Sequence, residues 1–210
     1  MKLLLIAFLL IPFVHPMQAR ADFTDTIEQE TIHTYSGSGI LSYSAFAKSP
    51  AGDIYLAYVK APDEIEILKW DGSGWTAVAN VTNTDAETST VEGALDLAVD
   101  ADNHLHLVFT IDSMKGIKYG YFDGSDWTFQ TLEWSDSSAT KRDNPNIAVD
   151  SNGKAHVIFR SVNSSSIPIN SLLRYASNAL NESGYWQVVT AVQTAAPKEW
   201  KYHAGIAVDS

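Results

Sequence analysis

The residues of this chain that could do chemistry recur with a period of about 50 residues, and two histidines show this well. His106 and His156 occupy equivalent positions in two copies of a repeated phrase, and Tyr55 fills the same position in a third. A metal or catalytic site would need these side chains to converge with a third ligand. Because each falls in a different copy, we expect each to pack or hydrogen-bond locally, and the sequence predicts no metal centre and no cofactor.

A polar stretch in two of the copies has the composition of a calcium-binding loop. It contains Asp100, Asp102 and Asn103 in one copy, and Asp150, Asn152 and Gly153 in the next. An EF-hand loop needs more ligands and a distant bidentate glutamate, and no glutamate follows at that spacing. We therefore expect a tight turn whose side chains bond to their own backbone.

Tryptophan also follows the repeat. Trp75, Trp127 and Trp186 recur once per copy, so they either fill the space between adjacent copies or form sugar-stacking platforms. We favour the packing role. Trp200 has no counterpart in the other copies and lies in a loop-like segment, which makes it a candidate ligand-binding residue.

The elements that must position these residues follow from self-comparison. The phrase "FAKSPAGDIYLAYV" begins at Phe46, "LAVDADNHLHLVFT" at Leu97 and "IAVDSNGKAHVIFR" at Ile147, while "IAVDS" returns at Ile206. Apolar residues alternate in the second half of each phrase, which indicates a strand, and Asp, Asn and Gly between the halves indicate a tight turn. Each copy reads as four short strands.

Four strands in about 50 residues predict an all-β fold, a β-propeller with one blade per copy. The expected partial propeller domain covers 22–210, with blades at about 46–80, 97–133 and 147–192 and a fourth blade starting at 206. Phe23 takes the place of a strand-four tryptophan, so the strand at 23–32 is expected to close a missing last blade. The ring would be incomplete, and we expect these 210 residues to be an N-terminal fragment.

The first residues predict export. Lys2, the apolar run 3–14 and the small residues Ala19 and Ala21 have the order of a signal peptide, so we expect residues 1–21 to be cleaved after Ala21. No later stretch reaches the roughly 20 apolar residues of a membrane span. The expected location is secreted, periplasmic or extracellular.

Composition excludes several functions. Cleavage would remove two cations and no acid, which takes the formal charge from −11 to −13. An acidic chain is poorly suited to nucleic acid, whose phosphates attract clusters of Lys and Arg. Absence of cysteine excludes disulfides and thiolate chemistry, so packing must stabilise the domain.

"IAVDSNGKAHVIF" and "YFDGSDW" resemble the repeats of exported bacterial and archaeal β-propellers. "AVDSNG" is similar to the strand-turn phrase of NHL-type repeats, and the whole unit looks like members of the sialidase-like propeller group. The sialidase Asp box, Ser-x-Asp-x-Gly-x-Thr-Trp, is not matched, because "DGSGW" and "DGSDW" place these residues in another order. The arginine and tyrosine set of sialidases is therefore not carried over.

The resemblance implies where a ligand would bind. In propellers, the loops from strand two to strand three and from strand four to the next blade share one face around the channel. Here those loops are expected at segments such as 60–64, 111–116, 136–146, 160–170 and 195–205. The candidate ligand-binding residues in them are Lys141, Arg142, Arg160, Trp200, Lys201, His203, Asp112 and Glu64. The cations would favour an anionic glycan, and carboxylates on the same face leave glycoside cleavage open.

The sequence therefore predicts a secreted propeller that binds a glycan or an extracellular protein, or acts as a scaffold, through this face. The alternative is an extracellular carbohydrate-active enzyme, either a sialidase-like hydrolase or a polysaccharide lyase. No nucleophile motif such as G-x-S-x-G is present, which favours binding over catalysis. Catalytic residues, blade number and oligomeric state are not specified by the sequence.

Overall fold

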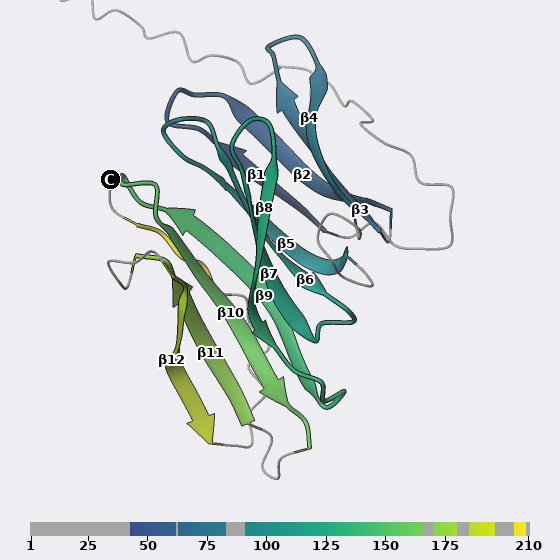
Figure 1. The fold of residues 1–210 in the computed structure, drawn as a ribbon, viewed down its shortest axis with the longest axis vertical. Helices are drawn as coiled ribbons and strands as arrows, with labels where there is room; N and C mark the ends of the chain where they lie inside the picture. The colour runs from purple at the N-terminus through teal and green to yellow at the C-terminus, as the bar shows by residue number, and fades with distance from the viewer. Residues whose placement is uncertain are drawn as a thin grey trace, which may run out of the picture. The chain divides into compact units, whose positions relative to one another are not determined.

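The computed structural model describes residues 43–61, 63–82, 91–165, 170–179, 185–195 and 204–208. These residues form three four-stranded antiparallel sheets, each with its strands in chain order, which we call blades 1, 2 and 3 (Figure 1). Blade 1 comprises β1 (Ser44–Lys48), β2 (Ile54–Ala61), β3 (Glu64–Trp70) and β4 (Trp75–Thr82). Blade 2 comprises β5 (Val91–Val99), β6 (Leu105–Ile111), β7 (Gly116–Phe122) and β8 (Trp127–Trp134). Blade 3 comprises β9 (Thr140–Val149), β10 (Ala155–Asn163), β11 (Asn170–Ser177) and β12 (Gln187–Ala195).

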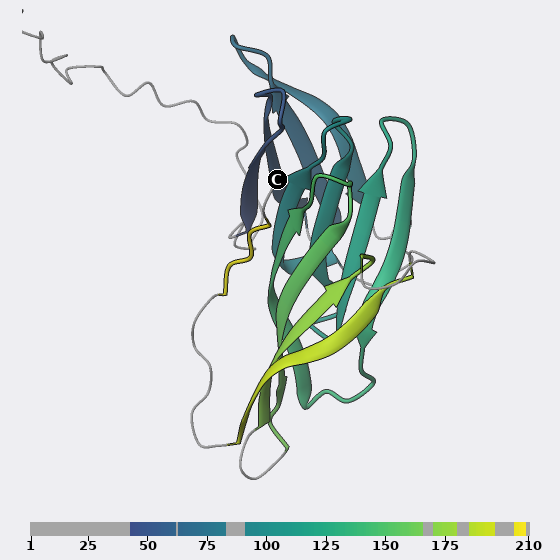
Figure 2. The same ribbon diagram turned by 90° about the vertical axis from the view of Figure 1, so that its left-hand side faces the viewer.

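The sheets pack face to face, because the alternating strands present apolar side chains on both of their faces. Leu105, Leu107 and Phe109 of β6 join one buried cluster with residues of blade 1. Val108, on the other face of the same strand, joins a second cluster with Val157 and other residues of blade 3. Blade 2 therefore lies between two apolar interfaces, and Figure 2 shows the three sheets stacked in chain order.

The first strands of successive blades are also linked by a polar contact. The Asp96 carboxylate in β5 accepts a hydrogen bond of 2.9 Å from the backbone N–H of Ile147 in β9. Burial raises the pKa of this carboxyl, opposed by the bonds that it accepts from the backbone of Ile147 and Leu97. The link sets the position of β9 beside β5.

The predicted all-β class and the four-stranded unit are confirmed. Two loop expectations are corrected, because the candidate loop at 136–146 belongs to β9 from Thr140 onward and Arg160 lies inside β10. The physical reason is a bulge, since β9 keeps pairing with β10 on both sides of Asn144, whose φ is 51°. Residues 204–208, where a fourth blade is predicted to begin, form no strand.

Antiparallel pairing places the connections of each blade at two opposite ends. We call one end the loop face; it holds the turns from strand two to strand three and the connections from strand four to the next blade. We call the other end the turn face; it holds the turns from strand one to strand two and from strand three to strand four. Within the described ranges, no helix has the length and apolar character needed to cross a membrane.

The packing role predicted for the repeated tryptophans is confirmed for Trp186, which contacts Tyr119 of blade 2 with ring centroids 4.7 Å apart. Trp127 packs against the cluster shared by blades 1 and 2 and stacks on Phe129. The rings of Trp127 and Phe129 both cover Gly120 in β7. Trp75 contacts Phe46 and Trp70 within its own blade.

We predict that Gly120→Ala destabilises the protein by about 1–3 kcal/mol, because overpacking displaces the covering rings. A Cβ at this position would lie 2.7 Å from Phe129 Cε1 and 3.0 Å from Trp127 Cζ3. Gly74→Ala is the matched control, since a Cβ there meets no atom within 4 Å. Urea denaturation measures both, and equal midpoints for the two variants would contradict the packing argument.

Candidate functional site

Strained backbone marks the loop face where blades 2 and 3 meet. Three consecutive residues of the β6–β7 turn are left-handed, with φ of 50° at Asp112, 58° at Ser113 and 66° at Met114. A single non-glycine residue in this region is uncommon. Such strain persists only where the surroundings over-determine it, and it clusters at functional sites.

Contacts from blade 3 hold this turn. Lys141 Nζ donates to the carbonyl of Ser113 at 2.8 Å, and the backbone N–H of Arg142 donates to the carbonyl of Met114 at 2.7 Å. The carbonyl of Lys115 accepts from Arg142 Nη1 at 3.0 Å and from the backbone N–H of Ser135 at 3.0 Å. The carbonyls of successive turn residues are thus directed at the start of β9.

Arg142 joins the two blades. Its side chain is 6% exposed, its Nε and Nη2 bond to Glu133 Oε1 at 3.0 and 2.8 Å, and Nη2 also contacts the carbonyl of Trp134. Arg174 of β11 reaches the other oxygen of Glu133 at 2.8 Å. All three guanidinium nitrogens of Arg142 therefore have partners inside the protein, and the structure gives this predicted ligand contact a structural role.

Trp134, at the end of β8, is a residue that the sequence analysis did not single out. Its side chain is 41% exposed, and its indole N–H donates to Asp136 at 2.9 Å. The ring lies over Gly116, where a Cβ would meet Trp134 Cε3 at 2.7 Å. Contact with Gly116 and the hydrogen bond to Asp136 thus fix the orientation of the Trp134 ring, while a large part of the residue remains exposed to solvent.

The other blades lack this pair. The cross-strand partners Gly116 and Trp134 correspond to Glu64 and Thr82 in blade 1, and to Asn170 and Ala195 in blade 3. Trp134 is therefore not needed to form a blade. The sequence analysis selected Trp200 because this aromatic residue has no counterpart in the other copies. The same criterion would have identified Trp134.

The remaining predicted residues are spread along the loop face. Arg160 pairs with Asp143 in blade 3, and Glu64 pairs with Lys60 at 3.3 Å in blade 1. Lys141 lies at the blade 2–3 junction, where it bonds to the turn that contains Asp112. Trp200, Lys201 and His203 lie outside the described residues.

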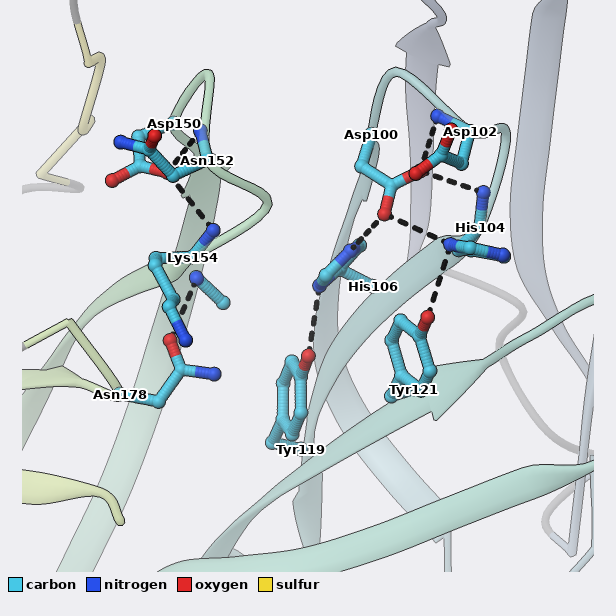
Figure 3. Close-up of polar contacts among 11 residues, drawn as sticks. Asp100, Asp102, His104, His106, Tyr119, Tyr121, Asp150, Asn152, Lys154 and Asn178 are labelled. Atoms are coloured by element: carbon cyan, nitrogen blue, oxygen red, sulfur yellow. Dashed lines mark hydrogen bonds and ion pairs between the residues drawn. The ribbon is translucent and has the colours of Figure 1, made fainter. Parts of the chain in front are cut away.

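On the turn face, each repeated histidine links its own turn to its own third strand, and Figure 3 shows this for His106. His106 Nδ1 lies 2.8 Å from the Tyr119 hydroxyl, and Nε2 lies 3.3 Å from Asp100 Oδ2. His156 repeats this arrangement in blade 3 with Tyr175 and Asp150, at 2.7 and 3.3 Å. The local role predicted for both histidines is confirmed.

The turn interpretation of the calcium-like segments is confirmed as well. Asp100 Oδ1 accepts the backbone N–H groups of Asp102 and His104, each at 2.9 Å. Asp150 does the same for Asn152 and Lys154. These side chains satisfy the turn backbone, as Asp commonly does.

Protonation of the blade 2 network follows from burial and bonding. Burial lowers the pKa of His106, opposed by its contact with Asp100. Burial also disfavours the ionised form of Asp100, but bonds from the His104 backbone and from both histidines outweigh it and leave the pKa of Asp100 lowered. The pKa of Tyr119 is raised, mainly by burial.

One group on the turn face has the donors to hold a metal ion. Asp100, Asp102 and His104 each offer one ligand atom, and these atoms lie within 4.8 Å of one another. His104 Nδ1 already lies 3.1 Å from Asp100 Oδ2 and 3.0 Å from the Tyr121 hydroxyl. These contacts explain the arrangement without an ion.

Comparison with known proteins identifies the fold. No protein-family model and no curated protein matches this sequence. Among solved structures, an α-L-arabinofuranosidase from Fusarium graminearum, in complex with an iminosugar inhibitor, matches with TM-score 0.57 and 12% identity over 74% of this chain and 50% of that one. An α-L-arabinanase from Penicillium chrysogenum, complexed with arabinobiose, matches with TM-score 0.54 and 15% identity over 74% and 50%. The fold is a β-propeller, and the chain spans about half the length of these structures.

We predict that Arg142→Ala destabilises the protein by about 3 kcal/mol, because it removes both bonds to Glu133 Oε1 and the side-chain bonds to the carbonyls of Lys115 and Trp134, and leaves Arg174 as the ion-pair partner of Glu133. Lys60→Ala is the control, since Lys60 pairs with Glu64 and Glu66 in a more exposed setting and should change stability little. Chemical denaturation compares the two variants. Equal stability of both would show that Arg142 does not hold the blade 2–3 junction.

We predict that His106→Gln weakens the dependence of stability on pH between about pH 7 and pH 5. In the unfolded chain a histidine takes up a proton near pH 6.5, whereas in the folded protein the pKa of His106 is lowered, so wild-type stability falls as the pH drops through this window. Urea denaturation across the pH series tests this. Parallel pH curves for the wild type and the variant would contradict it.

Proposed function

We propose that this chain is a carbohydrate-binding β-propeller module that recognises a glycan through its loop face. We also propose that it is exported, as its first 21 residues predict. Glycan binding is preferred over binding of a protein partner because of the one observation that carries the proposal, the fixed and exposed Trp134.

Trp134 has the geometry of a stacking platform. Aromatic rings supply a large apolar area at low cost in side-chain entropy, and the C–H face of a sugar ring is an apolar surface of similar size. Gly116 beneath the ring and the bond to Asp136 fix its orientation before a ligand arrives. Such pre-organisation favours binding because less ordering is required.

Polar groups share the loop face with this platform. Asp136 accepts the hydrogen bond of the indole N–H, and Lys141 and Asp112 lie on the same loop face, at the blade 2–3 junction. Hydroxyl groups of a sugar both donate and accept hydrogen bonds, so mixed donors and acceptors around an aromatic ring suit them. The structural neighbours, with an iminosugar inhibitor and arabinobiose bound, suggest which probes to use first.

The alternative is a carbohydrate-active enzyme, which the two glycosidase neighbours favour. Glycoside hydrolysis needs two carboxyl groups on either side of the scissile bond. In the described part of the loop face, Glu64, Glu133 and Asp143 each pair with a cation of the protein itself. Release of reducing ends from arabinan by the full chain would favour the enzyme.

We predict that the wild-type chain binds arabinobiose or another glycan on an array, and that Trp134→Ala weakens this binding about tenfold, equivalent to 1.4 kcal/mol. The loss follows from removal of the stacking surface. Isothermal titration calorimetry with the ligand selected on the array measures it.

Tyr185→Ala is the matched control. Tyr185 is also aromatic and is 72% exposed, but it precedes β12 and so lies at the turn-face end of blade 3, away from the loop face. It should leave affinity unchanged. Equal affinity of Trp134→Ala and wild type would reject Trp134 as the platform, and absence of any glycan binding by the wild type would reject the proposed function.

A further inference from the structure

We infer that the turn face of blade 2 binds one divalent transition-metal ion, for which Zn²⁺ is the probe, through Asp100, Asp102 and His104. The sequence analysis predicted no metal centre because it weighed the repeated histidines and not His104. Hydrogen bonds already hold the turn, so the ion binds to a formed structure and is not needed to build it. The site is independent of the proposed glycan site, which lies at the opposite end of the blades.

Two of the donor atoms already have the spacing of ligands on one ion. His104 Nδ1 and Asp100 Oδ2 are 3.1 Å apart, and tetrahedral ligands at about 2.1 Å from Zn²⁺ lie about 3.4 Å from one another. Figure 3 shows the Asp102 and His104 side chains beside the Asp100 carboxylate, and the three donor atoms lie within 4.8 Å of one another. Asp102 is exposed, so rotation of one surface side chain brings in the third ligand.

Asp100 is oriented before an ion arrives. Its side chain is 9% exposed, and its Oδ1 accepts the backbone N–H groups of Asp102 and His104. Its Oδ2 is therefore directed at the His104 ring, and His106 Nε2 contacts the same oxygen at 3.3 Å from the interior. Hydrogen bonds that hold a ligand from behind fix its orientation and strengthen metal binding.

The other blades form the same turn without these donors. In each blade, five residues separate the last residue pair of strands one and two, so the turns align without gaps. The positions of Asp102 and His104 are occupied by Asn152 and Lys154 in blade 3, and by Ala51 and Asp53 in blade 1. Blade 3 keeps both backbone bonds to its own aspartate. Asp102 and His104 are therefore not required for the turn.

Blades 1 and 3 each carry a lysine at this turn. In blade 1, Lys69 Nζ lies 2.8 Å from Asp53 Oδ2, and in blade 3, Lys154 takes the place of His104. The residue of blade 2 that corresponds to Lys69 is Tyr121, because each is the cross-strand partner of the repeated His or Tyr position. At these two positions blade 2 therefore lacks the ammonium group that each of the other two blades has.

This end of blade 2 carries an excess of negative charge. No Lys or Arg occurs in the segments 95–111 and 119–134, which contain both of its turns. Those turns contain the aspartates Asp100, Asp102, Asp123 and Asp126. A bound divalent cation is often the largest charge in such a site, and here it would offset carboxylates whose own turns contain no Lys or Arg.

The donor set selects the class of metal. Imidazole nitrogen together with carboxylate oxygen suits Zn²⁺ and neighbouring divalent transition metals. Ca²⁺ takes six to eight oxygen ligands, whereas this cluster offers two carboxylates and one nitrogen. Three protein ligands leave a further position on the ion for water.

The decisive experiment gives blade 2 the turn residues of blade 3. The double variant Asp102→Asn with His104→Lys keeps Asp100 and the turn bonds, so its melting temperature in EDTA should stay near that of the wild type. In isothermal titration calorimetry of EDTA-treated and dialysed protein, we expect the wild-type chain to bind one Zn²⁺, and the variant to bind it at least about a hundredfold more weakly. Zn²⁺ should raise the melting temperature of the wild type only. Absence of Zn²⁺ binding by the wild type, or wild-type affinity in the variant, would overturn the inference.

His104→Ala serves if the double variant does not fold, and it should also lose Zn²⁺ binding. His156→Gln is the matched control, because His156 lies at the equivalent end of blade 3 beside Asn152 and Lys154 and should leave affinity unchanged. Equal loss in both variants would overturn the inference. Tighter binding of Ca²⁺ than of Zn²⁺ would contradict the class of metal. The pH prediction for His106 concerns the metal-free protein and is measured in EDTA.

The outcomes separate the two proposals. A wild-type chain that binds Zn²⁺ but no glycan overturns only the proposed function. A chain that binds a glycan through Trp134 but does not bind Zn²⁺ overturns only this inference.

Discussion

Burial of one sheet face against the next is the constraint on which this structure depends. A four-stranded blade presents apolar side chains on both faces, so blade 2 is stabilised only when blades 1 and 3 cover it. Polar groups then fix the relative position of the sheets. Asp96 ties β5 to β9, and Glu133 receives Arg142 and Arg174 from blade 3. Both carboxylates accept hydrogen bonds from the neighbouring blade. Charged groups can therefore be buried between sheets whose other contacts are apolar.

Because every blade must form the same kind of sheet, residues that recur in the repeat can be distinguished from residues that occur in one blade only. Positions that recur, such as His106 and His156 with their Asp and Tyr partners, hold each turn to its third strand. Residues without a counterpart in the other blades are not required for this structural role. Trp134 over Gly116 occurs in one blade among the three described. Side chains that the frame does not need are the better candidates for function.

The fold was predictable because the repeat carries it. Phrases 50 and 51 residues apart specify strand, turn and strand, and the local role of both histidines followed from their equivalence. The site was less accessible. Arg142 was expected in a loop, but β9 continues on both sides of Asn144, which is left-handed and which the sequence analysis did not recognise as a bulge within a strand. Contacts such as Arg174 with Glu133, 41 residues apart, arise only when sheets stack. Trp134 did leave a signal, since it lies off the repeat.

Charge bears on which kind of glycan the proposed loop-face site would accept. The few cations of the loop face suggested an anionic ligand, yet in the described residues Lys60, Arg142 and Arg160 are each matched by carboxylates. Lys141 differs from these, because its hydrogen-bond partner is the carbonyl of Ser113. At long range, the formal charge of −11 repels acidic polymers at low ionic strength. Under the proposed function, this long-range repulsion would favour an uncharged glycan over an acidic one, because the uncharged glycan meets no electrostatic barrier on approach.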